Sequence, residues 1–436
     1  MSSPINKVID WIILHEYKAS LGTSDLQFAF KHKSSTTMCS LMLKEVVAYY
    51  SERGGTTFCT MLDASKAFNR LRYDKMFEIL EKKGLHPQTL RLLIHMYKNQ
   101  ETRTVWQSEH SEYFSTSNGI RQGGVASPVL FTLYMDVLIE RLEAEKIGCH
   151  IGSEFYGIMC YADDVTLVAP TASALQKMIE TCEQFGVDFD VKYNAGKSVC
   201  IQLGGLQIIP HPNMIMNGES LKWEESVKLL GNIVNSQLND NADIKRKQND
   251  FLVRTNAILA RFQHASRQAK IKLFTGKCCS FYGSQMWVLK GKSINELAVS
   301  WRKAVRRLLG LPRTTKSALL PYLMKCNNLK EQLGIRFIKF IKTILSSDNE
   351  KAKYLLKHRS KDGTVQQNID VLAAEMNIRA EDIITGNAWV PKYRLSEPVL
   401  QQRATAITEF MDLMQTMPNE RDNVNDILTY LCTTNL

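Results

Sequence analysis

The chain has 436 residues, enough for two or three domains with sizeable hydrophobic cores. Its hydrophobic fraction of 44% and charged fraction of 23% are typical of a globular protein. The net charge is +11 and is concentrated, since residues 241–316 carry 17 Lys or Arg and only three Asp or Glu. This basic block favours a polyanionic partner, most often nucleic acid, over the alternative of a solvated helical surface.

The ten cysteines are scattered, with no C-x-x-C pair, and Cys278-Cys279 suit neither a structural zinc site nor a disulfide framework. We therefore expect reduced thiols and an intracellular location, in the nucleus or the cytoplasm. No apolar run is long enough to span a bilayer, and no signal peptide opens the chain, so no membrane partner is expected. The start leads directly into an apolar segment, which indicates a chain that begins inside a larger fold.

The N-terminal part is predicted to alternate between helices and strands. Helical periodicity covers 5–20, 37–51, 73–83 and 87–98, and β-forming runs cover 56–62, 101–106 and 112–116. In the first helix, the residues expected to face inward are Val8, Ile9, Ile12 and Ile13. The strand over 56–62 follows a break at Gly54-Gly55, and Asp63 comes at its end.

A hairpin with two acids at its tip follows. A strong amphipathic helix is predicted over 128–146, with Ser127 as its cap. Apolar runs then flank Tyr161-Ala162-Asp163-Asp164, which is the pattern of strand, tight turn and strand. Two carboxylates between apolar strands are costly unless a cation or water meets their charge. With Asp63 they could form a site for two divalent metals, and the alternative is that each Asp only caps or turns.

The remaining elements divide the chain into two parts. A helix is predicted over 172–185, strands over 198–203, 214–216 and 228–234, and a turn at Asn217-Gly218. From about residue 240 onward the chain is predicted to be mostly helical. We therefore expect an α/β first part and a mostly α second part, with a boundary near residues 236–242.

Three segments resemble motifs of the reverse transcriptases. Residues 60–68 resemble their first catalytic motif, residues 119–128 the glycine-containing motif before the palm helix, and residues 161–164 the second acidic motif. Their order, with 100 residues from Asp63 to Asp163, makes the resemblance highly specific. It is closest to the jockey-like non-LTR retrotransposons, less close to group II intron proteins, and covers roughly residues 1–320.

The resemblance implies an α+β fold, a right-hand polymerase palm with a split βαβ antiparallel sheet, partial fingers and a helical thumb. It assigns partial fingers to residues 1–55, the palm to 56–238, a basic thumb to 239–320 and a helical region of unknown role to 321–436. Family members usually carry more fingers upstream. The resemblance therefore also implies an N-terminally truncated domain.

The implied activity is RNA-directed DNA polymerisation, in which dNTPs are added to a DNA primer on an RNA template. Asp63 and Asp163 would bind two Mg²⁺ ions, or Mn²⁺, with Asp164 as a more peripheral acid. Further implied positions are Phe68 against the ribose 2′-hydroxyl, Gln122 and Gly123 under the nucleotide and template base, Lys31 at the triphosphate, and Lys197 as a proton donor to pyrophosphate. For these, a core aromatic, a plain loop, an exposed lysine and a surface turn remain the alternatives.

The resemblance also implies contacts with nucleic acid. Leu230 and Gly231 would belong to a hairpin that steadies the primer end. Phosphates of the RNA–DNA duplex would be contacted by Lys245, Arg246, Lys247, Arg254, Arg261 and Arg267. No protein partner is indicated. The alternative function is a polymerase-shaped nucleic-acid-binding protein without catalysis, which would bind in a salt-dependent way without extending a primer.

Overall fold

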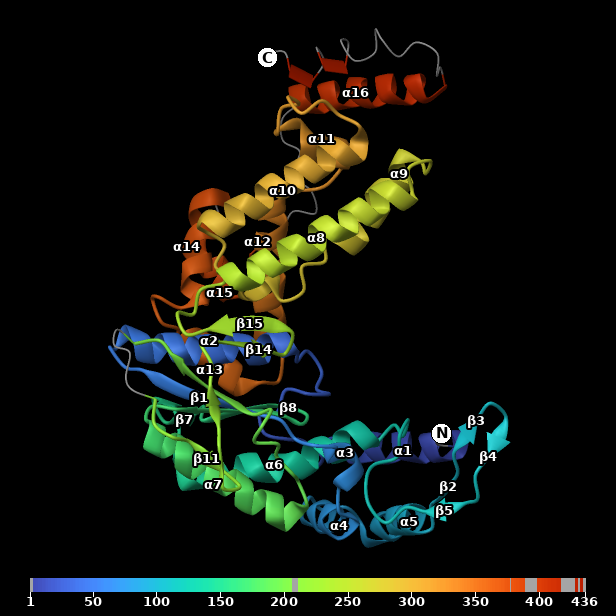
Figure 1. Ribbon diagram of the computed structural model, residues 1–436, viewed down its shortest axis with the longest axis vertical. Helices are drawn as coiled ribbons and strands as arrows, with labels where there is room; N and C mark the ends of the chain where they lie inside the picture. The colour runs from blue at the N-terminus through green and yellow to red at the C-terminus, as the bar shows by residue number, and fades with distance from the viewer. Residues whose placement is uncertain are drawn as a thin grey trace. The chain divides into compact units, whose positions relative to one another are not determined.

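The fold is that of a computed structural model, which describes residues 3–205, 211–376, 378–388, 398–416, 428–429 and 432–433. The chain divides into two compact units (Figure 1). Unit 1 comprises residues Met1–Leu238 and Ser346–Gly363, and unit 2 comprises Asn239–Leu345 and Thr364–Leu436. The chain first passes from unit 1 to unit 2 inside the boundary predicted near residues 236–242.

The centre of unit 1 is a five-stranded sheet with the order β13-β10-β1-β9-β8. Its strands are β1 (Thr57–Leu62), β8 (Ile158–Tyr161), β9 (Asp164–Ala169), β10 (Val199–Leu203) and β13 (Lys222–Trp223). Strand β1 is antiparallel to both of its neighbours, β9 and β10, whereas β13 pairs with β10 in parallel. The predicted α+β class with a largely antiparallel sheet is therefore confirmed.

Helices cover both faces of this sheet, which explains why nearly every residue of β1 is buried. Figure 1 shows α2 (Thr36–Glu52) on one face and α6 (Ser127–Glu145) with α7 (Ala172–Phe189) on the other. The other helices of unit 1 are α1 (Pro4–Glu16), α3 (Ala67–Arg70), α4 (Tyr73–Lys82), α5 (Pro87–Lys98) and α13 (Glu350–Lys357).

Short strand pairs surround the main sheet of unit 1. They are β2 (Glu101–Thr102) with β5 (Phe114–Ser115), β3 (Val105–Trp106) with β4 (Glu109–His110), β6 (His150–Ile151) with β7 (Glu154–Phe155), β11 (Ile215–Met216) with β12 (Glu219–Ser220), and β14 (Ser226–Leu229) with β15 (Asn232–Asn235). The turn predicted at Asn217-Gly218 is confirmed, because both residues have positive φ, 51° and 78°, between β11 and β12.

The predicted orientation of the first helix is wrong in part. Of the four residues expected inside, only Ile13 is buried, whereas Val8 is 57% exposed and Ile12 is 49% exposed. The helix instead buries Asp10, which is 1% exposed. Its carboxylate accepts two backbone N–H groups at the start of α6, and this contact sets which face of α1 points inward.

The predicted cap of the palm helix is also wrong. Ser127 is the first residue of α6, and its hydroxyl donates to the carbonyl oxygen of Arg121 at 2.7 Å. The N–H groups of Val125 and Ala126 donate to Asp10 Oδ2 at 3.1 and 3.3 Å. A carboxylate at this helix end also meets the positive end of the helix dipole, so Asp10, and not Ser127, is the side-chain acceptor at the start of α6, although it bonds the two residues before the first turn.

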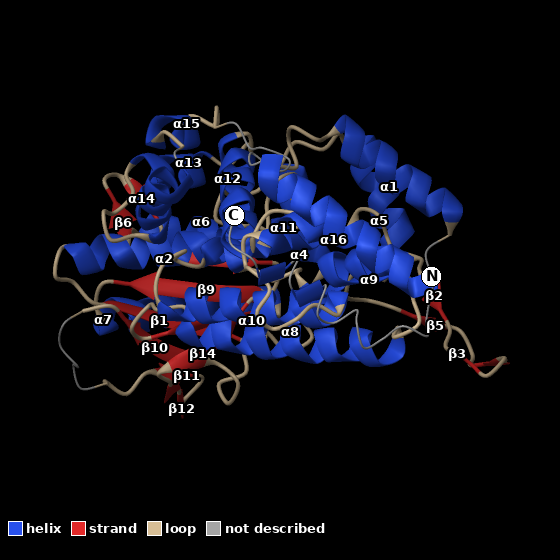
Figure 2. Cartoon of the chain, turned by 90° about the horizontal axis from the view of Figure 1, so that it is seen from above, coloured by secondary structure: helices blue, strands red, loops and turns tan. Residues whose placement is uncertain are grey.

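Unit 2 is helical in its described residues, and Figure 2 draws its labelled elements as helices. They are α8 (Asn241–Arg261), α9 (Arg267–Leu273), α10 (Lys292–Leu309), α11 (Leu319–Met324), α12 (Leu329–Leu345), α14 (Thr364–Met376), α15 (Ala380–Ile384) and α16 (Pro398–Thr416), with a π-helical turn at Phe274–Cys278 and a 3₁₀ turn at Ser284–Met286. Its core contains the buried Trp287, whose indole N–H donates to Asp243 Oδ2 at 2.9 Å. Across the described part of the chain, no helix combines the length and apolar character needed to cross a bilayer.

The residues 321–436, predicted above as a helical region of unknown role, are divided between the units. The segment Ser346–Gly363, with helix α13, belongs to unit 1, and the rest is assigned to unit 2. Residue 377, residues 389–397 and most of 417–436 lie outside the described residues. The reason for the division is local, because α13 packs against α2 and makes polar contacts with the loop that precedes it.

Candidate active site

Asp63 directly follows β1, and its main chain is fixed to the turn that precedes β10. Its N–H donates to Ser198 Oγ at 3.1 Å, and its carbonyl oxygen accepts the N–H of Asn194 at 2.9 Å. That turn is closed by the N–H of Ser198, which donates to Asn194 O at 2.9 Å. The Asp63 side chain remains 45% exposed, so a fixed backbone presents its carboxylate to solvent at the end of the sheet.

A tight turn between β8 and β9 holds the other two acids. Tyr161 pairs with Asp164 across the hairpin, so Ala162 and Asp163 form a two-residue loop. Ala162 has φ 58°, in the left-handed region that few non-glycine residues occupy but that tight hairpin loops require. Asp163 is half-buried and Asp164 is exposed.

The register between β1 and β9 shows how the acids face each other. Leu62 lies opposite Val165, so continuing this register by one residue sets Asp63 opposite Asp164. Directly opposed residues in antiparallel strands point to the same face of a sheet. The sequence assigned the central pair to Asp63 and Asp163, whereas the register places Asp164 directly opposite Asp63.

The three acids are close enough to affect one another's ionisation. Partial burial is the largest cause that raises the pKa of Asp163, and the negative charge of Asp63 raises it further. Partial burial also raises the pKa of Asp164, followed by the charges of Asp163 and Asp63. Among the described residues, neither Asp163 nor Asp164 has an ion-pair partner, and Lys197 Nζ lies 4.0 Å from Asp63 Oδ2. The group therefore has an excess of negative charge that a bound cation would relieve.

An open cleft with an empty volume of about 780 Å³ lies beside Asp63 and Asp164. The other residues on its wall are Met61, Leu62, Lys197, Val199, Glu224, Ser226, Val227 and Lys228. The hairpin of β14 and β15, predicted to steady the primer, thus borders the same cleft as the acids. Its turn residues Leu230 and Gly231 both have positive φ, 46° and 86°, as a tight hairpin needs.

Glu224 is a cleft residue that the sequence did not single out. It follows β13, and its N–H donates to Cys200 O at 2.9 Å. The parallel pairing of β13 with β10 brings Glu224 to the cleft. The local sequence does not predict a pairing between these two strands.

Oxygen ligands are present for a divalent metal, although they do not form a complete cage. Among the residues that the structure describes, no group of three His, Cys, Asp or Glu is arranged to hold a metal ion by itself. Mg²⁺ usually keeps several waters and uses one or two carboxylates together with substrate phosphates. The mutually repelling carboxylates of Asp63, Asp163 and Asp164 suit an ion bound in that way.

The residues expected around the nucleotide lie on two neighbouring segments. Phe68 stacks on Phe131 of α6 with ring centroids 3.9 Å apart, yet it remains 36% exposed. Its carbonyl oxygen accepts the N–H of Ile120 at 2.9 Å, which ties Phe68 to the glycine-containing segment. In that segment, Gln122 and Gly123 are both exposed, and Gly123 has φ 80° with open space where a Cβ would stand.

A glycine in this segment is required by packing. Gly119 has φ 89°, and a Cβ there would come within 2.9 Å of the carbonyl oxygen of Asn69. Its N–H donates to Leu71 O at 2.8 Å. The segment therefore passes directly over the chain between Phe68 and Leu71, at a distance that only glycine allows.

Lys31 is engaged with the main chain. Its ammonium donates to the carbonyl oxygens of Thr23 and Ser24 at 2.8 and 2.5 Å, and burial lowers its pKa. It is absent from the wall of the acid cleft. A triphosphate would have to compete with these two carbonyl groups for the lysine.

Gln27 is a second residue whose role the sequence did not indicate. Its side chain is fully buried, and Oε1 accepts the N–H groups of Ala162 at 3.0 Å and Ala29 at 3.1 Å. The available signal was a polar residue between Leu26 and Phe28, which are both buried. A buried amide needs hydrogen-bond partners, so such a residue can be suspected of a specific contact.

Helix α8 of unit 2 carries five of the predicted phosphate-binding residues. Lys247, Arg254 and Arg261 are seven residues apart, so they lie on nearly the same side of the helix. Lys245 and Arg261 are exposed. Lys247, Arg254 and Arg261 therefore form a basic stripe along α8 that adjoins the face buried in unit 2, whereas Lys245 lies on another side of the helix.

Several of these cations already have partners inside unit 2. Arg246 forms an ion pair with Asp243 at 2.6 Å, and Arg254 Nη1 donates to Ser280 Oγ at 3.1 Å. Lys247 Nζ lies 5.0 Å from the centre of the Tyr282 ring, a cation–π distance. Arg267 is paired with Asp412 at 2.7 Å.

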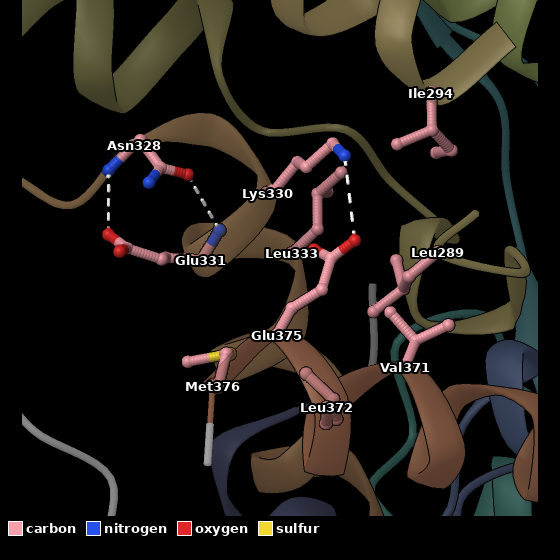
Figure 3. Close-up of a pocket in the computed structure, with 10 residues that line it drawn as sticks. All are labelled: Leu289, Ile294, Asn328, Lys330, Glu331, Leu333, Val371, Leu372, Glu375 and Met376. Atoms are coloured by element: carbon pink, nitrogen blue, oxygen red, sulfur yellow. Dashed lines mark hydrogen bonds and ion pairs between the residues drawn. The ribbon is translucent and has the colours of Figure 1, made fainter. Parts of the chain in front are cut away.

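A small pocket inside unit 2 offers no comparable chemistry (Figure 3). Its wall combines apolar side chains with two polar pairs, as Figure 3 shows. Lys330 pairs with Glu375 at 3.7 Å. Glu331 and Asn328 form a reciprocal cap, with N–H donors at 3.1 and 3.0 Å. These polar groups satisfy one another, so the acid cleft of unit 1 remains the candidate active site.

Comparisons with known proteins identify the family of the chain. A family model described as reverse transcriptase (RNA-dependent DNA polymerase) matches residues 4–234, more than half of the chain. The retrovirus-related Pol polyprotein from type-1 retrotransposable element R2 of Nasonia vitripennis is 30% identical over 149 residues, which cover 34% of this chain and 14% of the relative. The RNA-directed DNA polymerase from mobile element jockey of Drosophila funebris is 24% identical over 275 residues, 60% of this chain and 29% of the relative.

One similar solved structure is that of telomerase from Candida albicans in complex with the TWJ fragment of telomeric RNA. It is 11% identical, with a TM-score of 0.42, and the match covers 99% of this chain and 59% of that chain. The chain spans less than a third of the length of the two curated relatives. The family match and the observed sheet confirm the predicted α+β polymerase palm and the resemblance to non-LTR retrotransposon proteins. The chain belongs to the reverse transcriptase (RNA-dependent DNA polymerase) family.

Proposed function

We propose that this chain is the RNA-directed DNA polymerase domain of a non-LTR retrotransposon protein. It would add dNTPs to the 3′-hydroxyl of a DNA primer, with RNA as the template. The acid cleft carries the proposal, because Asp63 and Asp164 line it together and Asp163 adjoins them in the hairpin turn. No rival grouping of catalytic residues was apparent in the sequence, and family membership gives the acids a chemical context.

We propose that Asp63, Asp163 and Asp164 hold two divalent ions, with Mg²⁺ preferred by oxygen ligands and Mn²⁺ also accepted. Bound there, the ions would lower the pKa of the primer hydroxyl and stabilise charge on the triphosphate and the leaving pyrophosphate. The protein contributes a fixed backbone for all three carboxylates, so little reorganisation is needed when substrate arrives. Lys197, 4.0 Å from Asp63 and 70% exposed, can donate a proton to the pyrophosphate.

The remaining predicted residues would bind nucleotide, primer and template. The exposed edge of Phe68 would exclude a ribose 2′-hydroxyl, and the main chain at Gln122 and Gly123 would support the base pair. Lys31 would meet the triphosphate after releasing its carbonyl partners. The hairpin turn at Leu230 and Gly231 would hold the primer end.

The basic stripe on α8 would contact phosphates of the RNA–DNA duplex without reading its sequence. Lys247 and Arg261 are the stripe cations best placed for this role, and Lys245 is exposed on another side of the helix, while Arg246 and Arg254 would exchange internal partners for phosphates. Replacing one phosphate-binding cation by a neutral residue should reduce the slope of log K against log salt by about 0.7 to 0.9. Free thiols at all ten cysteines fit the proposed intracellular location in the nucleus or cytoplasm.

The test is primer extension by the full chain on an RNA template with dNTPs and Mg²⁺, comparing wild type with Asp163→Asn. We expect the variant to lose extension while keeping its fold. Asp188→Asn is the matched control, since Asp188 is a carboxylate outside the cleft that pairs with Arg141 at 2.7 Å. Its extension rate should stay within about twofold of wild type, as for surface pairs of small energetic value.

The outcomes separate the proposal from its alternative. Full activity in Asp163→Asn would contradict the assignment of the acid cleft. Binding of the primer–template that weakens steeply with salt, without extension by wild type, would favour a nucleic-acid-binding protein without catalysis. A chain that neither extends nor binds would contradict both functions.

A further inference from the structure

An extended segment lies along the outer edge of the sheet beside the catalytic hairpin. Residues 26–28 run parallel to β8, and Gln27 forms a bridge with Cys160. The N–H of Cys160 donates to Leu26 O at 2.8 Å, and the N–H of Phe28 donates to Cys160 O at 2.8 Å. The strand that leads into the turn at Asp163 is therefore held by main-chain bonds on its free side.

Gln27 extends this contact into the turn itself. Its Oε1 accepts the N–H of Ala162 at 3.0 Å, and Ala162 is the residue with φ 58° that precedes Asp163. Oε1 also accepts the N–H of Ala29 at 3.1 Å, so this one oxygen joins the loop after Gln27 to the turn. An N–H that is buried beside apolar strands needs an acceptor. The orientation of the Tyr161–Ala162 peptide, at the start of the turn that carries Asp163, therefore depends on one side-chain oxygen.

The loop that carries Gln27 is anchored on two further elements of unit 1. On α6, both carboxylate oxygens of Asp136 accept the N–H of Ser24, at 2.9 and 3.0 Å. On α13, the N–H groups of Glu350 and Lys351 donate to Asp25 Oδ2, at 2.7 and 3.2 Å. The carboxylate of Asp25 thus occupies the N-terminal end of α13, where orphan N–H groups favour an anion.

Helix α13 is itself firmly attached to unit 1. Lys351 Nζ lies 3.0 Å from a carboxylate oxygen of Glu143 and 3.0 Å from one of Glu154, and the lysine side chain is only 14% exposed. Its carbonyl oxygen accepts the hydroxyl of Tyr156 at 2.9 Å. The segment Ser346–Gly363 therefore provides a fixed support for the loop rather than a loose tail.

We propose that Gln27 is a positioning residue for the catalytic turn. Ser346–Gly363 contributes to the same positioning, because it holds the loop that carries Gln27. The contacts run from α13 through Asp25 to the loop, from Gln27 to Ala162, and from there to Asp163. Gln27 touches no reacting atom; it sets the direction in which the Asp163 carboxylate leaves the hairpin. This inference rests on the proposed polymerase function.

The test compares Gln27→Met with Thr57→Val in the full chain. Methionine keeps the approximate volume of Gln27 but removes the acceptor oxygen. Thr57→Val removes a buried hydrogen bond of the same sheet, from Thr57 Oγ1 to Leu203 O at 3.0 Å, at the far end of β1. We expect Gln27→Met to speed hydrogen exchange of the Ala162 N–H by about tenfold or more.

The same variant should lower kcat for primer extension by about 10- to 100-fold, as misplacement of a reacting group does, with the KM for dNTP within about twofold. Thr57→Val should lower the melting temperature without changing either the exchange of Ala162 or kcat. A merely structural role for Gln27 would give the two variants the same pattern of effects.

A second pair of variants probes the support from α13. Asp25→Ala removes the acceptor at the N-terminal end of α13. Asp348→Ala, the control, changes an exposed acid of Ser346–Gly363. We expect Asp25→Ala to speed exchange of Ala162 by a factor of about three, less than Gln27→Met does, and Asp348→Ala to leave it unchanged. If Gln27→Met does not fold, this pair decides the inference.

Unchanged exchange of Ala162 in both Gln27→Met and Asp25→Ala would overturn the positioning role. It would also be overturned if exchange rose and kcat fell no further than in Thr57→Val. If wild type failed to extend a primer, the proposed function would be wrong, while the exchange data would still decide whether Gln27 fixes the turn.

Discussion

Unit 1 contains two groups of aspartates that its fold treats differently. Asp10, Asp25 and Asp136 accept backbone N–H groups from other elements and so join helices to loops. Asp163 and Asp164, by contrast, have no ion-pair partner among the described residues and repel Asp63. The first group uses its carboxylate oxygens as acceptors that hold the architecture together. The second group keeps negative charge for a ligand that the protein itself does not supply.

This difference predicts that neutralisation affects activity in one group and stability alone in the other. Removing charge from a cleft acid should abolish a ligand-dependent activity and relieve repulsion. Removing charge from an architectural acid should change stability according to how well its partners offset its burial.

The largest effect is expected for the cleft acids in catalysis. Asp63→Asn should lower the rate of primer extension by about 10³-fold or more, because metal coordination contributes several kcal/mol. Measuring Asp163→Asn and Asp164→Asn under the same conditions ranks the other two acids. A larger loss for Asp164→Asn would support the pair that the strand register sets opposite each other. A loss under tenfold for Asp63→Asn would contradict the comparison.

Asp136 should give the largest change in stability. Burial raises its pKa to about 6, above the ordinary value of 3.8. For an acid with a raised folded pKa, the linked stability is present below about pH 4 and is lost as pH rises toward 6. Asp136→Asn, which keeps one acceptor oxygen for Ser24, should therefore increase the free energy of unfolding at pH 7.5 by up to about 3 kcal/mol.

Urea unfolding of both proteins at several pH values measures this effect. The difference between Asp136→Asn and wild type should appear between pH 4 and 6 and stay constant above pH 7. Asp188→Asn is the control of opposite sign, because Arg141 holds the pKa of Asp188 below its usual range. A pH-independent difference for Asp136→Asn would show that burial does not control its charge.

Lys351 tests how the support of the Gln27 loop is held. Lys351→Met removes the cation between Glu143 and Glu154 and should lower the free energy of unfolding by about 1 to 2 kcal/mol, between the values for surface and buried pairs. Lys353→Met in the same helix is the control. Its pair with Glu350 spans one turn, with 76% of the glutamate side chain exposed, and should be worth under about 0.5 kcal/mol. Equal losses in urea unfolding would contradict the special role of Lys351.

The smallest effect concerns the cleft acids without metal. Partial burial raises the pKa of Asp163, so its charge opposes folding at neutral pH. Without metal, Asp163→Asn should raise the melting temperature slightly. The gain in the free energy of unfolding should be less than about 1 kcal/mol, because the site is half exposed. Adding Mg²⁺ should stabilise wild type more than the variant, since an ion that binds the native state shifts unfolding. Scanning fluorimetry of both proteins measures this: the variant should melt at the higher temperature in EDTA, and wild type should gain more on addition of Mg²⁺.

The sequence predicted those features that local patterns determine. A β-forming run that ends at Asp63, and two apolar runs around Asp163 and Asp164, identify strands and a turn without any knowledge of the partners. The positive φ values at Asn217 and Gly218 likewise follow from local chemistry, since glycine has no Cβ and asparagine can hydrogen-bond to its own backbone. The family resemblance then linked these local features into one site.

The features that it missed depend on contacts between distant segments. Asp10 faces inward because it accepts backbone N–H groups at the start of α6, and the hydrophobic periodicity of α1 does not predict this contact. Glu224 reaches the cleft through a parallel strand pairing, and Gln27 acts through a residue 135 positions away. The return of Ser346–Gly363 to unit 1 could not be inferred either, because its helix differs in no local property from those of unit 2.

The return of Ser346–Gly363 to unit 1 also delays the completion of unit 1 during protein synthesis. Asn349 Nδ2 donates to the carbonyl oxygen of Asp25, 324 residues earlier in the chain. At a translation rate of about 5 to 20 residues per second, the ribosome needs on the order of 15 to 65 seconds to make the intervening chain. The last strand of the sheet, β13, ends at Trp223 and α13 begins at Glu350, so in the last part of that time the sheet of unit 1 has all its strands but lacks α13. Nascent unit 1 is thus exposed to chaperones and proteases before its last element leaves the exit tunnel.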